Sequence, residues 1–146
     1  MNTKEIISLL PYTEPFLFVD EIEEVSEQRI KGNYTFKEDA YFYKGHFKDH
    51  PVTPGVILTE CMAQIGLVSL GIYLLKDKIA LETMKVAFTS ADVSFLKPVY
   101  PNEKVTVISE VKYFRFHKLK CHVKLYNQAH ELVCQGELAG VFQVSL

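Results

Sequence analysis

The chain has 146 residues, with 48% hydrophobic residues, 23% charged residues and a formal net charge of −2 at pH 7. This length and composition predict one globular domain, residues 1–146, which can bury a core without disulfides or metals. The balanced charge excludes the extended basic surface that nucleic-acid binding requires, so no nucleic-acid partner is expected.

The three cysteines, Cys61, Cys121 and Cys134, form an odd number with no close spacing. This pattern argues against both a disulfide framework and a zinc site, so each thiol is expected to be a small apolar core residue. The first residues lack the basic segment and apolar stretch of a signal peptide, so a cytoplasmic protein is expected.

The first half of the chain predicts one short helix, two strands and one long helix. Thr3 can cap a helix that continues to Leu10, and a β-rich run follows at 16–20. Residues 29–36 alternate imperfectly and predict a strand, and 38–49 predict a loop with three aromatic residues. Gly55 then begins a long apolar helix that ends at about Lys76.

Residues 56–75 of this helix are long and apolar enough to span a bilayer. However, Glu60 interrupts the stretch, and a carboxylate that faces lipid costs several kcal/mol. A helix that is apolar nearly all round is also typical of a buried central helix. We therefore expect a soluble protein with no membrane partner.

The second half of the chain alternates with period two and predicts four strands, at 85–96, 105–114, 118–125 and 131–144. The turns between them are short, so we expect a four-stranded antiparallel meander. That sheet has a single apolar helix to cover. The expected fold class is therefore α+β, with an antiparallel sheet wrapped around one long central helix. The alternative is a fold in which the helix and strands are divided between two small layers.

Glu60 lies about one and a half turns into the predicted helix, between Leu58 and Met62. Burial among these apolar residues would raise the pKa of its carboxyl group, because the charged form is disfavoured there. A raised carboxyl pKa suits a general acid at neutral pH. The alternative is that Glu60 faces solvent or a polar neighbour.

His46 lies between the aromatic loop and the proline-rich approach to the helix. Histidine exchanges protons readily near neutral pH, so His46 can act as a general base, although a solvated loop histidine is the alternative. Pro54 and Gly55 begin the helix, whose first N–H groups lack internal partners and can polarise a carbonyl group. The alternative is that Pro54 and Gly55 simply begin the helix and have no functional role.

The other histidines show no spacing typical of metal ligands, and we find no phosphate-binding loop or nucleophile elbow, so no metal and no cofactor are expected. Basic residues give two of the late strands a positive character. This pattern fits either an ordinary solvated face or a docking surface for an acidic carrier. The residues are Lys112, Arg115, Lys118, Lys120 and Lys124.

Several segments together resemble the FabZ-type 3-hydroxyacyl-[acyl-carrier-protein] dehydratases. Residues 9–11 and 15–20 resemble the N-terminal signature of that family. Gly45-His46-Phe47, Pro51-Val52, Pro54-Gly55-Val56 and Glu60-Cys61-Met62-Ala63-Gln64 resemble its active-site segment, and Phe95-Leu96-Lys97-Pro98-Val99 with Pro101 resembles its downstream strand and turn. The similarity extends from about Glu5 to Val141.

The resemblance implies the hot-dog fold and a catalytic pair, His46 and Glu60, with the N–H of Gly55 holding the thioester carbonyl. It implies removal of water from a (3R)-hydroxyacyl thioester on acyl carrier protein, giving a trans-2-enoyl thioester, in fatty acid or related polyketide or polyene synthesis. Other expected substrate-binding and tunnel-lining residues are Val56, Phe47, Ile57 and Phe95, with Val86 and Phe88.

The resemblance also implies a homo-oligomer, because in this family the two residues of one site come from different subunits. A dimer is the minimum, and trimers of dimers are common. Glutamate at position 60 matches the FabZ-type branch, whereas the isomerising FabA-like branch carries aspartate. The chain departs from the family pattern at Tyr12-Thr13, Lys48-Asp49, Thr53 and Cys61.

Two alternative functions remain open from the sequence. A hot-dog acyl thioesterase also uses a carboxylate on the helix and an N–H at the helix start, but it does not need His46 in this context. A non-catalytic acyl-binding subunit of the same fold would be marked by the loss of His46 or Glu60, and both residues are present.

Overall fold

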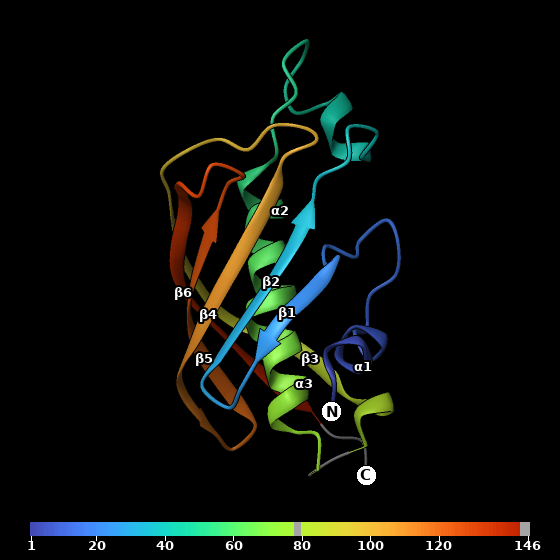
Figure 1. The fold of residues 1–146 in the computed structure, drawn as a ribbon, viewed down its shortest axis with the longest axis vertical. Coiled ribbons are helices and arrows are strands. Elements are labelled where there is room, and N and C mark those ends of the chain that lie inside the picture. The colour runs from blue at the N-terminus through green and yellow to red at the C-terminus, as the bar shows by residue number, and fades with distance from the viewer. Residues whose placement is uncertain (78–79, 144–146) are drawn as a thin grey trace.

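The computed structural model describes residues 1–77 and 80–143. It contains a six-stranded antiparallel sheet that curves around one long helix (Figure 1). The predicted α+β layout is therefore confirmed. The strands are β1 (Glu21–Val25), β2 (Arg29–Thr35), β3 (Lys85–Phe95), β4 (Lys104–Arg115), β5 (Lys118–Tyr126) and β6 (Leu132–Gln143), and their order in the sheet is β1-β2-β4-β5-β6-β3.

The predicted four-stranded meander is wrong in one respect, because β3 does not pair with β4. Only β4, β5 and β6 follow one another in the sheet, whereas β3 pairs with β6 and forms the far edge. The segment after β3 crosses the start of the central helix instead of forming a hairpin. Thr53 N–H donates to the carbonyl of Val99 at 2.8 Å, and Asn102 N–H donates to that of Phe36 at 2.6 Å. Alternation within a strand does not specify which strand lies beside it.

The N-terminal region differs from the prediction in two details. Helix α1 (Thr3–Ser8) is capped by Asn2, whose Oδ1 accepts a hydrogen bond of 2.9 Å from Glu5 N–H, and not by Thr3. The β-rich run at 16–20 is not a strand, and β1 begins only at Glu21. In this run the backbone of Phe16 and Phe18 bonds a side chain of the central helix, and Asp20 N–H donates to the carbonyl of Asn33 on β2 at 2.9 Å.

The central helix consists of α2 (Gly55–Ala63), a π-helical turn η2 (Gln64–Ser69) and α3 (Leu70–Leu74). These 20 residues are long and apolar enough to cross a membrane, with a mean hydropathy of 1.7, but 78% of the apolar window is buried inside the protein. That burial is expected for the core helix of a curved sheet. The π-helical turn was not predicted.

The inner face of the sheet packs on this helix. The inward residues of β5 are fully buried and alternate with partly exposed ones, as predicted. Gly71 permits the closest approach, because a Cβ there would lie 2.0 Å from the ring of Phe142. The three cysteines are buried and free. Two 3-10 turns, η1 (Tyr41–Lys44) and η3 (Leu81–Thr83), complete the described elements, and the predicted end of the last strand at Val144 lies outside the described residues.

Candidate active site

Glu60 lies on α2, where its side chain borders a cavity of about 180 Å³. Burial raises the pKa of the Glu60 carboxyl group, and a hydrogen bond from Gln64 opposes this effect. Glu60 is the only carboxyl-bearing residue among the lining residues, so a ligand there would meet one carboxyl group on an otherwise mainly apolar wall. The other lining residues are Tyr12, Phe16, Ala63, Leu67, Val68, Val86, Ala87 and Phe88.

Gln64 fixes the Glu60 carboxyl group and was not assigned a role from the sequence. Its Nε2 donates to Oε2 of Glu60 at 2.9 Å and to the carbonyl of Phe16 at 3.0 Å, while its Oε1 accepts from Phe18 N–H at 2.7 Å. The amide is fully buried. Its position four residues after Glu60, on the same face of the helix, was the available signal.

The π-helical turn begins at Gln64 and is held by two hydroxyl groups. Ser69 Oγ donates to the carbonyl of Gln64 at 2.7 Å, and Ser109 Oγ on β4 donates to that of Gly66 at 2.8 Å. Both hydroxyl groups therefore bond backbone carbonyls of the π-helical turn. Single π-helical turns occur frequently at functional sites, and this one begins directly after the turn that bears Glu60.

His46 lies in the segment between η1 and α2, which projects beyond the end of the sheet at the top of Figure 1. Its Nδ1 lies 2.9 Å from the carbonyl oxygen of Val52. A carbonyl only accepts, so we assign the ring proton to Nδ1, which leaves Nε2 free to accept a proton. The ring of Phe47 stacks on that of His46, with centroids 3.9 Å apart.

A buried hydrogen bond anchors the same segment. The hydroxyl groups of Tyr43 and Thr53 lie 2.6 Å apart, and both residues are buried. Val52 N–H also donates to the carbonyl of His46 at 2.9 Å. These bonds anchor the segment on both sides of His46 and so fix the position of the imidazole. Part of the segment is nevertheless exposed to solvent.

Gly55 is the first residue of α2 and lies against Phe95 of β3. A Cβ at Gly55 would lie 3.2 Å from the Phe95 ring, and both residues line a second cavity of about 410 Å³. Val56 is 76% exposed, whereas Ile57 is only 8% exposed and packs in the core. The expected lining residues are thus divided: Val86 and Phe88 border the Glu60 cavity, and Phe95 borders the Gly55 cavity.

Within one chain the structure does not join His46 to Glu60. Among the described residues no hydrogen bond links the two side chains, and His46 is not among the residues lining the Glu60 cavity. Within one chain His46 therefore lies outside the surroundings of Glu60. His46 offers a ring nitrogen that can accept a proton, and Glu60 offers a carboxyl group whose pKa is raised by burial.

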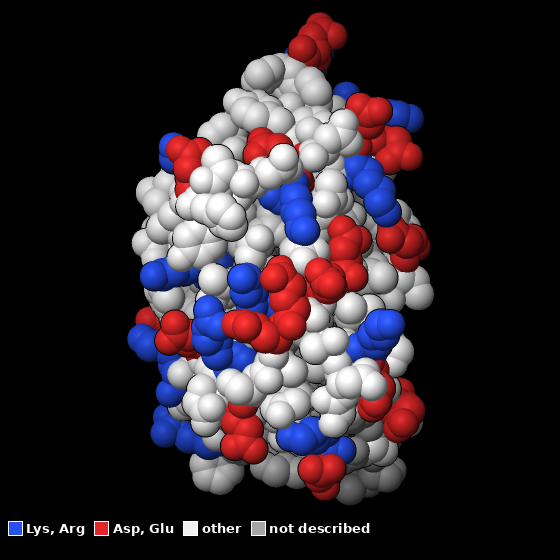
Figure 2. All heavy atoms as spheres, in the orientation of Figure 1, with Lys and Arg blue, Asp and Glu red and all other residues white. Residues whose placement is uncertain are grey.

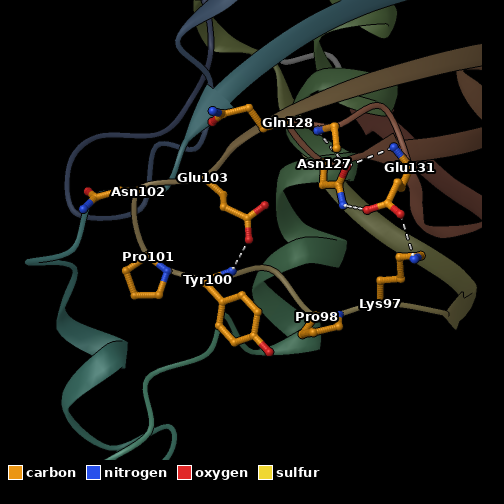
Figure 3. A pocket seen from close by; sticks show the side chains of 10 residues that line it. Lys97, Pro98, Tyr100, Pro101, Asn102, Glu103, Asn127, Gln128 and Glu131 are labelled. Carbon is orange, nitrogen blue, oxygen red and sulfur yellow. Dashed lines mark hydrogen bonds and ion pairs between the residues drawn. The ribbon is translucent and has the colours of Figure 1, made fainter.

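A larger cavity, of about 530 Å³, lies between the β3–β4 and β5–β6 connections and contains none of the predicted site residues (Figure 3). Most of its polar side chains already have hydrogen-bond partners, several of them within the cavity wall. Glu131 accepts hydrogen bonds from Asn127 Nδ2 at 2.9 Å and from Lys97 Nζ at 3.0 Å, and Glu103 accepts from Tyr100 N–H at 3.0 Å. This internal pairing leaves few groups for a ligand. No cluster that could hold a metal ion occurs in the described part of the chain.

Comparison with known proteins identifies the family of the chain. The model of the FabA-like domain matches residues 10–139. The chain belongs to the FabA-like family. Among its FabA-like relatives, it is 35% identical over 145 residues to the 3-hydroxyacyl-[acyl-carrier-protein] dehydratase FabZ of Roseiflexus castenholzii, with 94% of each chain covered. It is 38% identical over 112 residues to the protein of the same name from Petrotoga mobilis, with 76% of each chain covered.

Solved structures share the fold of this FabA-like chain. The dehydratase heterocomplex ApeI:P from Xenorhabdus doucetiae matches with a TM-score of 0.79 and 13% identity, covering 94% of this chain and 90% of that one. A thioesterase from Haemophilus influenzae matches with a TM-score of 0.71 and 15% identity, covering 99% and 92%. At these identities the likeness shows the hot-dog fold alone, which confirms the expected architecture.

Proposed function

We propose that the protein removes water from a (3R)-hydroxyacyl thioester on acyl carrier protein and releases a trans-2-enoyl thioester. The observation that carries the proposal is the carboxyl group of Glu60, which burial keeps protonated to higher pH beside an apolar cavity. An acid of this kind can protonate a leaving hydroxyl group at neutral pH. Membership of a family whose relatives are named as FabZ dehydratases supports the same reaction.

In the proposed step, Nε2 of His46 accepts the proton from C2 of the substrate. The electron pair of that C–H bond forms the C2=C3 double bond, and the C3–O bond breaks. Glu60 donates its proton to the departing hydroxyl group, which leaves as water. Loss of a proton from His46 to solvent and return of one to Glu60 restore the starting state, so the reaction is redox-neutral.

The start of the central helix would stabilise the negative charge that develops on the thioester oxygen. The first N–H groups of a helix lack intrahelical acceptors and lie at the positive end of its dipole. Gly55 has no side chain to keep the substrate from this backbone, and the cavity it lines with Phe95 gives access to it. A donor of this kind contributes roughly 10²–10³-fold to turnover.

We further propose that one site contains residues of two protomers, since His46 and Glu60 do not meet within one chain. Strand β3 is the edge of the sheet next to β6, with 11 residues that have no strand on the other side among the described residues. Its Phe88 is 47% exposed and borders the Glu60 cavity. A second copy paired along β3 would cover this edge, and its projecting segment would bring its His46 to Glu60.

The carrier protein would dock on the tip of the β4–β5 hairpin. Phe116 at this tip is 97% exposed and is flanked by Arg115 and Lys118. Figure 2 shows Lys and Arg side chains gathered at the lower left, where Figure 1 places this hairpin. Lys112 and Lys120 are partly neutralised by Glu137, at 2.8 and 3.5 Å. An acidic carrier would therefore be attracted mainly to the tip.

Exchange of Arg115 and Lys118 for glutamate tests this docking surface. We expect a higher KM for a substrate on acyl carrier protein and an unchanged KM for the same acyl group on pantetheine. Equal effects on both substrates would contradict docking at the tip. The three buried free thiols fit a reducing compartment such as the cytoplasm, where this carrier would be met.

Turnover of 3-hydroxyacyl and crotonyl thioesters tests the proposed reaction. We expect Glu60→Gln and His46→Ala each to lower turnover by roughly 10²–10⁴-fold while the proteins remain folded. Near-normal turnover in either variant would remove that residue from the mechanism. Release of free thiol without formation of the enoyl product would instead identify a thioesterase, and binding of acyl thioesters without any turnover would identify a non-catalytic subunit.

A further inference from the structure

The Glu60 cavity contains a second polar group that the proposed mechanism does not use, the phenol of Tyr12. Tyr12 and Glu60 line the same cavity, and the remaining walls are apolar side chains. Burial and the nearby charge of Glu60 both raise the pKa of Tyr12 above its ordinary value of 10.0. The phenol therefore stays neutral and keeps its hydrogen-bond donor throughout the neutral pH range.

The position of Tyr12 is set by its surroundings. The aromatic ring is partly buried and packs against the core. The chain that follows is tied to the central helix by Gln64, which bonds the backbone of Phe16 and Phe18. The same amide holds Glu60, so one side chain fixes both the carboxyl group and the segment that carries the phenol.

Both groups keep hydrogen-bonding capacity toward the cavity. Glu60 uses Oε2 for Gln64, whereas its Oε1 has no hydrogen-bond partner among residues 1–77 and 80–143. Within the same described residues, the hydroxyl group of Tyr12 has none either. A hydroxyl group on a ligand has one donor and two acceptor sites, so it can bond a carboxyl group and a phenol together.

We propose that Tyr12 is a specificity-determining residue that hydrogen-bonds the 3-hydroxyl group of the substrate alongside Glu60. This inference rests on the proposed function, because it assigns the acyl C3 position to the Glu60 cavity. Its consequence is discrimination between 3-hydroxyacyl chains and saturated chains of equal length. A site whose polar groups are satisfied by a substrate hydroxyl group disfavours an analogue that lacks it.

Direct binding to His46→Ala protein tests the proposal, since this variant keeps both Glu60 and Tyr12 and is expected not to consume the ligand. The probes are 3-hydroxyhexanoyl-pantetheine and hexanoyl-pantetheine, titrated by calorimetry with and without Tyr12→Phe. We expect the His46→Ala protein to prefer the hydroxylated probe, and Tyr12→Phe to weaken that probe roughly tenfold while leaving the saturated probe unchanged.

Phe16→Leu is the matched control, because it alters the apolar wall of the same cavity and should change both affinities together. An unchanged preference in Tyr12→Phe, or an equal loss for both probes, would overturn the role assigned to Tyr12. Neither outcome affects the proposed reaction, which is tested separately by turnover of the wild-type protein. If His46→Ala consumes the hydroxylated probe at a near-normal rate, the assignment of His46 as the base fails instead.

Discussion

Gln64 Nε2 donates a hydrogen bond of 2.9 Å to Oε2 of Glu60, one helical turn earlier on the same face of the central helix. This single bond links the π-helical turn to the carboxyl group that we propose as the general acid. It also keeps the carboxyl group turned toward the segment before β1, because the same nitrogen bonds the carbonyl of Phe16.

Removal of this amide should be costly. Gln64→Ala leaves Phe18 N–H and the carbonyl of Phe16 without their buried partners, so we expect the free energy of unfolding to fall by about 2–4 kcal/mol. Urea unfolding measures the change. Gln135→Ala, at a partly exposed position on β6, is the control and should change stability by less than about 0.5 kcal/mol. A loss equal to that of the control would show that the buried amide is not structurally important.

Mixing of two inactive variants should restore activity. If His46 forms one site with the Glu60 of the partner protomer, a hybrid dimer of Glu60→Gln and His46→Ala contains one intact site and one doubly altered site. Random exchange of protomers should then give about a quarter of wild-type turnover. The measurement is turnover after the two proteins are unfolded and refolded together, with each protein refolded alone as control. An inactive mixture that contains hybrid dimers would place both residues of a site in one chain.

The stability of the protein should depend on pH through Glu60. Burial raises the pKa of this carboxyl group above its ordinary value of 4.5 in the folded state. As pH rises past 4.5, the unfolded chain loses the proton before the folded chain does, so folding is progressively disfavoured until the raised pKa is passed.

Glu60→Gln removes this titration. Urea unfolding of both proteins from about pH 4 to pH 8 should show the wild type losing stability relative to the variant as pH increases. A constant difference between the two proteins would mean that the folded and unfolded carboxyl groups ionise alike.

The buried pair Tyr43 and Thr53 should show coupled effects. Thr53→Val leaves the Tyr43 hydroxyl group without its buried partner and should cost about 1–3 kcal/mol of unfolding free energy. Tyr43→Phe added to Thr53→Val should cost clearly less than the sum of the single changes, because neither polar group is then left unsatisfied. Strictly additive losses in a denaturant double-mutant cycle would argue against this bond as a support for the His46 segment.

A methyl group at the helix start should impair activity more than folding. Gly55→Ala brings a Cβ to 3.2 Å from the Phe95 ring and into the cavity where the thioester carbonyl would approach the backbone. We expect roughly 10–100-fold lower turnover with little change in stability. Gly45→Ala is the control, since nothing lies within 4 Å of its Cβ position. Equal turnover of the two variants would remove Gly55 from the proposed site.

Much of the fold was predictable because its signals are local. The apolar run after Gly55 specified a long buried helix, and the alternation from Lys118 to Leu125 specified a strand with one buried face. These patterns depend on neighbours a few residues apart, so they can be read along the chain. The proposal of His46 and Glu60 as catalytic residues came from their local sequence and from the resemblance of these segments to a known family, and it stays a prediction.

Only the tertiary structure decided which elements meet. It placed β3 beside β6, and within one chain it placed His46 outside the cavity that Glu60 borders. It also brought Tyr12 to the cavity of Glu60, with 47 residues between them in the chain. Contacts of this kind form between surfaces that are far apart in sequence and become neighbours only when the sheet closes around the helix. No local periodicity in the sequence predicts these contacts.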